Sequence, residues 1–188
     1  MDIKGKQLDF IEETHVYHVD GEQVESVTQL LGRVFPNKYA DIPKEVLRQA
    51  SERGTQIHKA IEAYCKGFDD GSDEVKDFKF LQKHYGFVVV ENELPMILPL
   101  GDKTFAGTTD MIFKMDDILC LADIKTTSEL DKNYLGYQLN LYKIGIEQSY
   151  GYDIQALYGI HIKNGKRKLV KIPIVSEEQL YESIKEIL

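Results

Sequence analysis

Two short apolar segments separated by a tight polar connection constrain the fold of this chain most. Residues 107–113 (GTTDMIF) and 119–126 (LCLADIKT) are rich in residue types that favour β-strands. The polar residues between them predict a β-hairpin. Because side chains alternate along a strand, Asp123 and Lys125 are expected to point to the same face of the sheet.

The length of the turn decides where Asp110 lies. A two-residue turn at Asp116 and Asp117 places Asp110 directly opposite Asp123, and a four-residue turn places it diagonally. An odd-length turn would put Asp110 on the wrong face unless a β-bulge corrected it. Two carboxylates roughly 5 Å apart repel by about 3 kcal/mol at an effective dielectric constant near 20. A divalent cation would offset both charges, whereas Lys125 offsets one; the alternative is a salt-bridged polar rim at the strand ends.

Composition predicts one ordinary globular domain. The chain has 188 residues, of which 43% are hydrophobic and 29% charged. We expect no membrane span and no signal peptide. The two cysteines, Cys65 and Cys120, fit the free thiols of a cytoplasmic protein. They cannot supply the four thiolates of an all-cysteine zinc or iron–sulfur site within one chain.

The charge balance argues against a broad basic surface. The formal net charge is −8, which disfavours general nucleic-acid binding but does not exclude a local basic groove. Basic residues nevertheless cluster near the C-terminus and on one predicted helix, and we expect a solvated face for each cluster. The clusters are Lys163, Lys166, Arg167, Lys168 and Lys171, and Lys76, Lys79 and Lys83.

The order of predicted elements indicates an α/β fold with a central mixed sheet flanked by helices. Residues 1–36 are expected to form an N-terminal β-hairpin extension and a short helix, residues 43–174 the core, and residues 176–188 a C-terminal helix. In the long helix 43–64, Val46, Ala50 and Ile57 are predicted to share one apolar side. The other expected elements are a helix near 75–85, strands 87–98, 103–113 and 118–126, a helix 130–149, and strands 154–162 and 169–174.

Four further polar residues are candidates for the site. His58 lies at the border of the apolar side of its helix, and Glu62, four residues on, could pair with it. Gln138 lies within the core-facing stripe of helix 130–149, where a buried amide needs partners. It either bonds to a loop carbonyl or points at the carboxylates or a phosphate. Glu93 lies on a strand beside the hairpin, where a solvated strand end is expected.

The order of these motifs resembles the PD-(D/E)xK nuclease superfamily, and most of all its RecB-type and phage-exonuclease branch. The resemblance covers about residues 53–146 and rests on four short motifs in the right order. They are Gly54-Thr55-x-x-His58, Gly107-x-x-Asp110, Asp123-Ile124-Lys125 and Gln138-x-x-x-Tyr142. Thr109 replaces the proline that names the family, and the four-cysteine cluster of some RecB-type relatives is absent. Residues 15–34 look like the equivalent segment of prophage-encoded members.

The resemblance implies a restriction-endonuclease-like core and a metal-dependent deoxyribonuclease, with exonuclease action of phage or prophage type expected. It also implies Mg²⁺ or Mn²⁺ as cofactor and DNA as substrate, and it leaves open a recombination or repair protein as partner and oligomer formation. His58, Asp110, Asp123 and the Ile124 carbonyl would bind metal, and Lys125 would act with the two aspartates in catalysis. Gln138 and Tyr142 would contact the site and the DNA backbone, with Glu93 and Glu62 as further candidates. The alternative is a catalytically inactive nucleic-acid- or protein-binding module on the same fold.

Overall fold

A computed structural model describes residues 1–12 and 14–188, over which the chain forms nine strands and five helices. In chain order these are β1 (Asp2–Ile3), β2 (Lys6–Ile11), β3 (Val16–Val19), β4 (Glu22–Ser26), α1 (Val27–Val34), α2 (Lys44–Cys65), α3 (Asp73–Tyr85), β5 (Val88–Leu100), β6 (Lys103–Met115), β7 (Ile118–Lys125), α4 (Lys132–Tyr150), β8 (Ile154–Lys163), β9 (Lys166–Ile172) and α5 (Glu177–Ile184).

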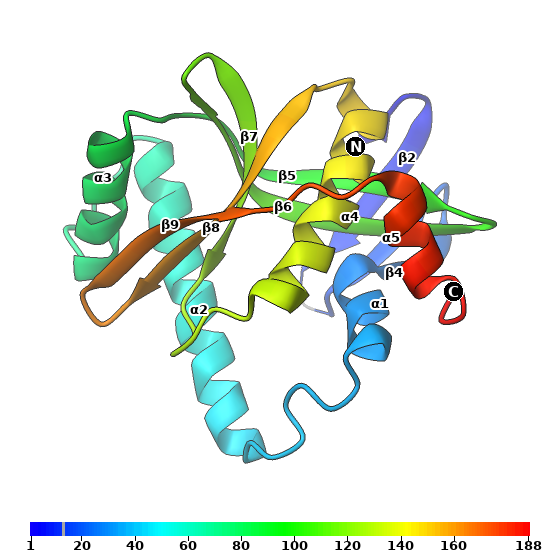
Figure 1. Cartoon of the computed structure of the whole chain (residues 1–188), viewed down its shortest axis with the longest axis horizontal. Helices are drawn as coiled ribbons and strands as arrows, with labels where there is room; N and C mark the ends of the chain where they lie inside the picture. Colours follow the sequence, from blue (N-terminus) through cyan, green and yellow to red (C-terminus); the bar gives the residue numbers. More distant parts are fainter. Residues whose placement is uncertain (13) are drawn as a thin grey trace.

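The predicted mixed sheet with flanking helices is confirmed. The strand order is β1-β2-β3-β4-β6-β7-β8-β9, with β5 paired to the other edge of β6. The β4–β6 and β7–β8 pairs are parallel, and the other pairs are antiparallel. In Figure 1, α4 lies across the centre of the sheet, whereas α2 and α3 lie at its other side.

Alternate residues of β7 separate the two main core layers. Leu121 packs with residues of α1, α4 and α5, whereas Cys120 and Ala122 pack with residues of α2 and α3. Asp123 and Lys125 share the parity of Leu121 and therefore belong to the α4 face. The site residues thus occupy the C-terminal end of a strand whose other side chains are buried on both faces.

The N-terminal prediction was correct but incomplete. The Asp20-Gly21 turn joins β3 to β4, and Ser26 and Gln29 form a capping box at the start of α1. Strands β1 and β2 were missed because β2 (KQLDFI) buries only Leu8 and so has little apolar alternation. Together β1–β4 extend the sheet beyond the expected hairpin.

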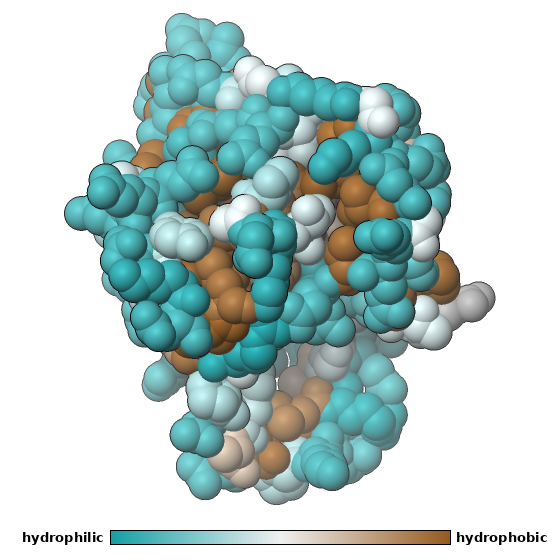
Figure 2. Space-filling model, turned by 90° about the vertical axis from the view of Figure 1, so that its right-hand side faces the viewer, coloured by the Kyte–Doolittle hydropathy of each residue, from teal (hydrophilic) through white to brown (hydrophobic). Residues whose placement is uncertain are grey.

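The predicted apolar side of the long helix is wrong over its first half. Ile57 and Ile61 are buried, but Val46 is 52% exposed and Ala50 is also exposed. Figure 1 shows that the start of α2 extends past the sheet. In Figure 2 the same region is the lower lobe, where apolar areas are visible among hydrophilic ones.

Across the described residues, no helix combines the length and the apolar character needed to cross a membrane.

Candidate active site

The candidate site lies where β6 changes partners. On one edge, β6 pairs with β4 through Phe105 and Ala106, and with β7 only from Met111 onward. Asp110 stands in the gap between these two pairings. Met115 pairs with Ile118, so the turn between the two strands has two residues. Ile112 pairs with Leu121, and the same register continued by two residues brings Asp110 opposite Asp123. The fork between β4 and β7 therefore leaves room for side chains to converge on the end of β7.

The turn explains this register. Asp116 and Asp117 both have positive φ values, 50° and 63°, as a type I′ hairpin turn requires. Aspartate tolerates this conformation better than most residues other than glycine. The two-residue alternative from the sequence is thus the correct one.

Helix α2 brings His58 to the end of β7. A Cβ atom on Gly54 would lie 3.3 Å from Thr126 Oγ1, so the glycine permits close approach one turn before His58. His58 Nε2 lies 3.0 Å from the Ile124 carbonyl oxygen. A carbonyl oxygen can only accept, so Nε2 must carry a proton in this contact. The other ring nitrogen, Nδ1, lies 3.5 Å from Asp110 Oδ1.

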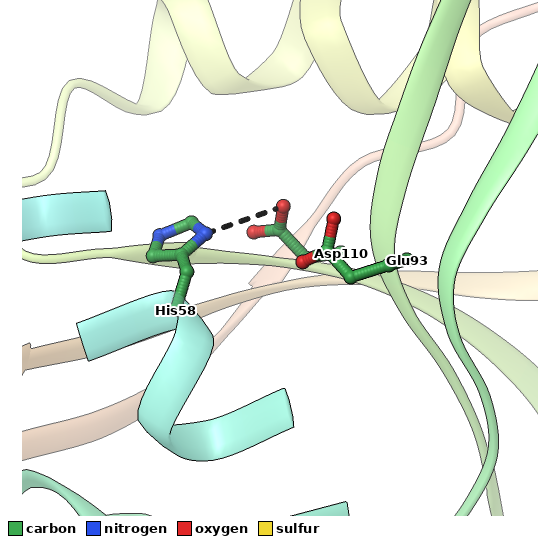
Figure 3. A group of neighbouring side chains, drawn as sticks. All are labelled: His58, Glu93 and Asp110. Atoms are coloured by element: carbon green, nitrogen blue, oxygen red, sulfur yellow. Dashed lines mark ion pairs between the residues drawn. The ribbon is translucent and has the colours of Figure 1, made fainter. Parts of the chain in front are cut away.

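Strand β5 contributes Glu93. This residue has a left-handed backbone conformation (φ 51°), which is uncommon for glutamate inside a strand. Its side chain is partly exposed and points toward His58 and Asp110 (Figure 3). Ligand atoms of His58, Glu93 and Asp110 all lie within 4.8 Å of one another. The expected solvated strand end is therefore wrong, and these three residues are called the donor cluster below.

Asp123 and Lys125 form a buried ion pair beside the donor cluster. Lys125 Nζ lies 2.7 Å from Asp123 Oδ2, and the Asp123 side chain is only 3% exposed. Despite this proximity, Asp123 Oδ2 has no hydrogen bond of regular geometry from any described residue. Asp123 is not part of the donor cluster. A buried carboxylate oxygen with unused acceptor capacity is suited to an additional cation.

Helix α4 contributes a hydrogen-bond partner to the ion pair. Lys125 Nζ donates to Gln138 Oε1 at 3.0 Å, and Gln138 Nε2 lies 3.5 Å from the Tyr142 hydroxyl. Gln138 and Tyr142 are both buried. A Cβ atom on Gly107 would lie 2.9 Å from the Tyr142 ring, so this glycine is what allows the ring to pack on β6. Tyr142 thus reaches the site through Gln138, and contact with a substrate backbone stays a prediction.

The pKa values of the two aspartates are shifted in opposite directions. For Asp110, burial disfavours ionisation, but the adjacent His58, Lys125 and the Ile124 N–H donor, at 2.6 Å, hold its pKa below the usual range. For Asp123, burial raises the pKa to about 6 despite the opposing effect of Lys125. One aspartate is therefore stabilised as a carboxylate by the protein, and the other is not fully compensated.

The pKa values of His58, Glu93 and Lys125 are also shifted. Burial disfavours protonated His58, but the Asp110 carboxylate outweighs it and raises the pKa of His58 to about 9. Burial, followed by repulsion from Asp110, raises the pKa of Glu93 to about 7. Burial favours the neutral form of Lys125 and so lowers its pKa, but Asp123 and Asp110 outweigh this effect and raise the pKa above the usual range. The site therefore holds protons on His58 and Lys125 at neutral pH.

The residues fit a hard divalent cation. Carboxylate oxygens suit Mg²⁺ and Mn²⁺, and an imidazole favours Mn²⁺ of the two. The donor cluster provides two carboxylates and one imidazole, and Asp123 adds a buried carboxylate whose Oδ2 pairs with Lys125. The Ile124 carbonyl faces the same space, since it accepts from His58. Glu62 is not part of this group because it pairs with Lys66, so the expected pairing of Glu62 with His58 is wrong.

Lys38 is a further basic residue next to the site that the sequence did not indicate. Lys38, in the connection between α1 and α2, lies 3.2 Å from Asp131 Oδ2 and 3.1 Å from the centre of the Tyr134 ring. Burial lowers the pKa of Lys38, and Lys125 and Asp123 are near enough to affect it. A lone lysine in a polar connection carries no sequence signal, so only the fold could reveal it.

Comparisons with known proteins support the fold and leave the activity to the site. No protein-family model matches the chain. No curated protein matches it either. The solved structure of SSO0001 is similar with a TM-score of 0.54 and 17% identity, covering 90% of this chain and 77% of that one. A candidate exonuclease from Eubacterium rectale gives a TM-score of 0.49 and 12% identity, covering 87% of this chain and 77% of that one.

Proposed function

We propose that this chain is a metal-dependent nuclease that hydrolyses phosphodiester bonds in DNA, with exonuclease action as its expected mode. The observation that carries the proposal is the convergence of the donor cluster and the buried ion pair at the fork between β4 and β7. Two buried carboxylates so placed would destabilise the fold without counter-charge. The PD-(D/E)xK resemblance assigns the same positions to metal binding and catalysis.

In this proposal His58, Asp110 and Asp123 hold Mg²⁺ or Mn²⁺, with the Ile124 carbonyl as a further oxygen ligand. The donor cluster adds Glu93 to this set. A bound divalent cation would activate a water molecule and stabilise negative charge on the attacked phosphate. His58 must release a proton before its ring can act as a ligand.

Lys125 would act on the reacting groups. Its pKa lies above the usual range, so it is protonated at neutral pH and suited to donate a hydrogen bond to the attacking water or to the phosphate. Gln138 accepts from Lys125 at 3.0 Å and would hold the ammonium group in position. Gln138 is thus a positioning residue, whereas Lys125 is a catalytic residue.

One assay tests the proposal. End-labelled linear DNA and circular DNA are incubated with Mg²⁺ or Mn²⁺, with an EDTA control. We expect metal-dependent loss of linear DNA, and attack on the circle would instead indicate endonuclease action. An inactive binding module would leave both DNAs intact in either metal.

Metal binding is tested separately by thermal unfolding. Mn²⁺ should raise the melting temperature of the wild type, because a ligand bound only to the folded state stabilises it. Asp110→Asn should abolish most of this shift. Asp117→Asn is the matched control, since Asp117 lies in the turn of the same hairpin with a side chain 95% exposed and paired with Lys114. Equal shifts in the two variants would contradict the metal site.

A further inference from the structure

The segment that forms β8 and β9 is unusually free of acidic residues. The chain contains 31 acidic and 23 basic residues, yet no Asp or Glu occurs between Asp153 and Glu177. Within this stretch lie Lys163, Lys166, Arg167, Lys168 and Lys171. Positive charge is therefore concentrated on one hairpin of an otherwise acidic protein.

The hairpin divides its basic residues between two faces. Arg167 points toward α3, where it pairs with Asp77 at 2.5 Å and lies 3.8 Å from the centre of the Phe80 ring. Side chains alternate along β9, so Lys166 and Lys168 point the opposite way. Lys163 is paired with Lys166 and lies on that same face. Lys163, Lys166 and Lys168 are called the lysine face below.

The lysine face has no neutralising partner among the described residues. Lys163 lies directly opposite Lys166. Like charges directly opposite one another destabilise a sheet. By contrast, Lys76 and Lys79 on α3 pair with Asp73 and Asp69, at 3.0 and 2.6 Å. Folding gives no reason for the lysine face, whereas Lys76 and Lys79 are satisfied within the protein.

The register connects this face to the candidate active site. Lys125 on β7 pairs with His161 on β8, and His161 pairs with Lys168 on β9. Adjacent strands are about 4.8 Å apart, so Lys168 lies only two strands, or roughly 10 Å, from Lys125 along the sheet. His161 Nε2 also contacts the Thr127 carbonyl at 2.7 Å and so fixes the loop that follows Lys125. Lys125, His161 and Lys168 thus lie in a row across the sheet, and the row begins at the site.

We propose that the lysine face binds the phosphate backbone of the polynucleotide whose reacting phosphodiester lies at Lys125. The inference rests on the proposed function for the position of that phosphodiester. Lysine ammonium groups contact phosphates as point charges and without base specificity. The substrate is therefore a nucleic-acid strand several nucleotides long, and the lysine face binds its backbone away from the reacting bond. A dinucleotide, which has a single phosphodiester, cannot reach both places.

The test compares two triple variants with the same loss of charge. Lys163→Gln, Lys166→Gln and Lys168→Gln together remove the lysine face. Lys76→Gln, Lys83→Gln and Lys171→Gln together remove three exposed lysines from α3 and from the opposite face of β9. Because the like-charge pair of Lys163 and Lys166 is removed, the first variant should melt at the wild-type temperature or above it.

Binding is measured with labelled single-stranded DNA at several salt concentrations, with Ca²⁺ in place of Mg²⁺. For an oligonucleotide of about 20 nucleotides, losing three phosphate contacts should reduce the slope of log K against log salt by about 2. The control variant should keep the wild-type slope. For a dinucleotide, which has a single phosphodiester, the lysine-face variant and the wild type should bind alike, because only the site itself is contacted.

The outcomes separate this inference from the proposed function. An unchanged slope in a folded lysine-face variant overturns the inference, as does an equal reduction in the control variant. The same two variants are then assayed for cleavage with Mn²⁺. If the wild type cleaves no DNA but the slopes differ as expected, the lysine face binds nucleic acid and the nuclease proposal fails. If the wild type cleaves DNA and the slopes are equal, only the inference fails.

Discussion

The buried ion pair and the donor cluster each hold a largely buried aspartate, but they balance its negative charge in different ways. In the buried ion pair, Asp123 is compensated by a lysine from its own strand, two residues away. In the donor cluster, Asp110 is compensated by a protonated His58 from a helix and by the Ile124 N–H group. The first arrangement follows from strand alternation alone, whereas the second needs three separate elements to meet. The first is therefore local, and the second exists only in the folded protein.

This difference separates two roles. A proton on His58 can be exchanged for a metal ion, because a neutral imidazole is a ligand. Lys125 keeps its proton, and its ammonium group remains available to the reacting phosphate. We therefore expect changes in the ion pair to affect the chemical step, and changes in the donor cluster to affect metal binding.

The largest effect is expected for Lys125→Ala. Loss of a positioned cation should lower the single-turnover cleavage rate by roughly 100-fold or more, which corresponds to about 2.7 kcal/mol of transition-state stabilisation. Metal and DNA binding should change far less. Lys114→Ala is the matched control, because Lys114 lies on the neighbouring strand and pairs with the exposed Asp117. A stable and fully active Lys125→Ala protein would remove the lysine from the mechanism.

A smaller effect is expected for Glu93→Gln, which changes the donor cluster without touching the ion pair. If Glu93 is a ligand, its loss should weaken Mn²⁺ binding by roughly 10-fold, as measured by calorimetry. At saturating Mn²⁺ the cleavage rate should recover most of its wild-type value. Glu91→Gln is the control, since Glu91 lies on the same strand but accepts from Tyr152. Unchanged Mn²⁺ affinity would place Glu93 outside the metal site.

A more modest change is expected for Gln138→Ala, which leaves Lys125 in place but removes its support. Loss of one hydrogen bond to a charged group is worth about 1.5 kcal/mol, so cleavage should slow by roughly 10-fold. Gln138→Glu restores an acceptor and should recover part of the rate. Full activity in Gln138→Ala would mean that Lys125 needs no positioning from α4.

The sequence predicted the ion pair well and the donor cluster only in part. Alternation within residues 107–126 was enough to place Asp123 and Lys125 together, and the Asp116-Asp117 turn fixed the register. Glu93 was misplaced because its left-handed backbone conformation redirects the side chain, and periodicity cannot show this. The exposed first half of α2 was missed for a related reason: its apolar spacing is helical, but the sheet ends before it.

The smallest effect concerns the pH dependence of stability, and it tests the buried ion pair and the donor cluster together. Besides Lys125, three groups of the site have raised pKa values: His58 (about 9), Glu93 (about 7) and Asp123 (about 6). A raised pKa means that the folded state holds protons more tightly than the unfolded state, so stability falls as the pH rises. For His58, the contribution is complete below pH 6.5 and is lost as the pH passes 9. For the two acids, it is lost between about pH 4 and pH 7.

Asp110 has the opposite sign, because its pKa is lowered, but its contribution is lost only below about pH 4. The melting temperature of the protein in EDTA should therefore fall by a few degrees between pH 5 and pH 9. With saturating Mn²⁺ it should instead rise over the same range, because the ligands deprotonate to bind the ion. Glu93→Gln should flatten the fall between pH 5 and pH 7 and leave the fall near pH 9 to His58. A melting temperature in EDTA that rises steadily from pH 5 to pH 9 would contradict the raised pKa values, and with them the view that protons on the donor cluster occupy the place of a metal ion.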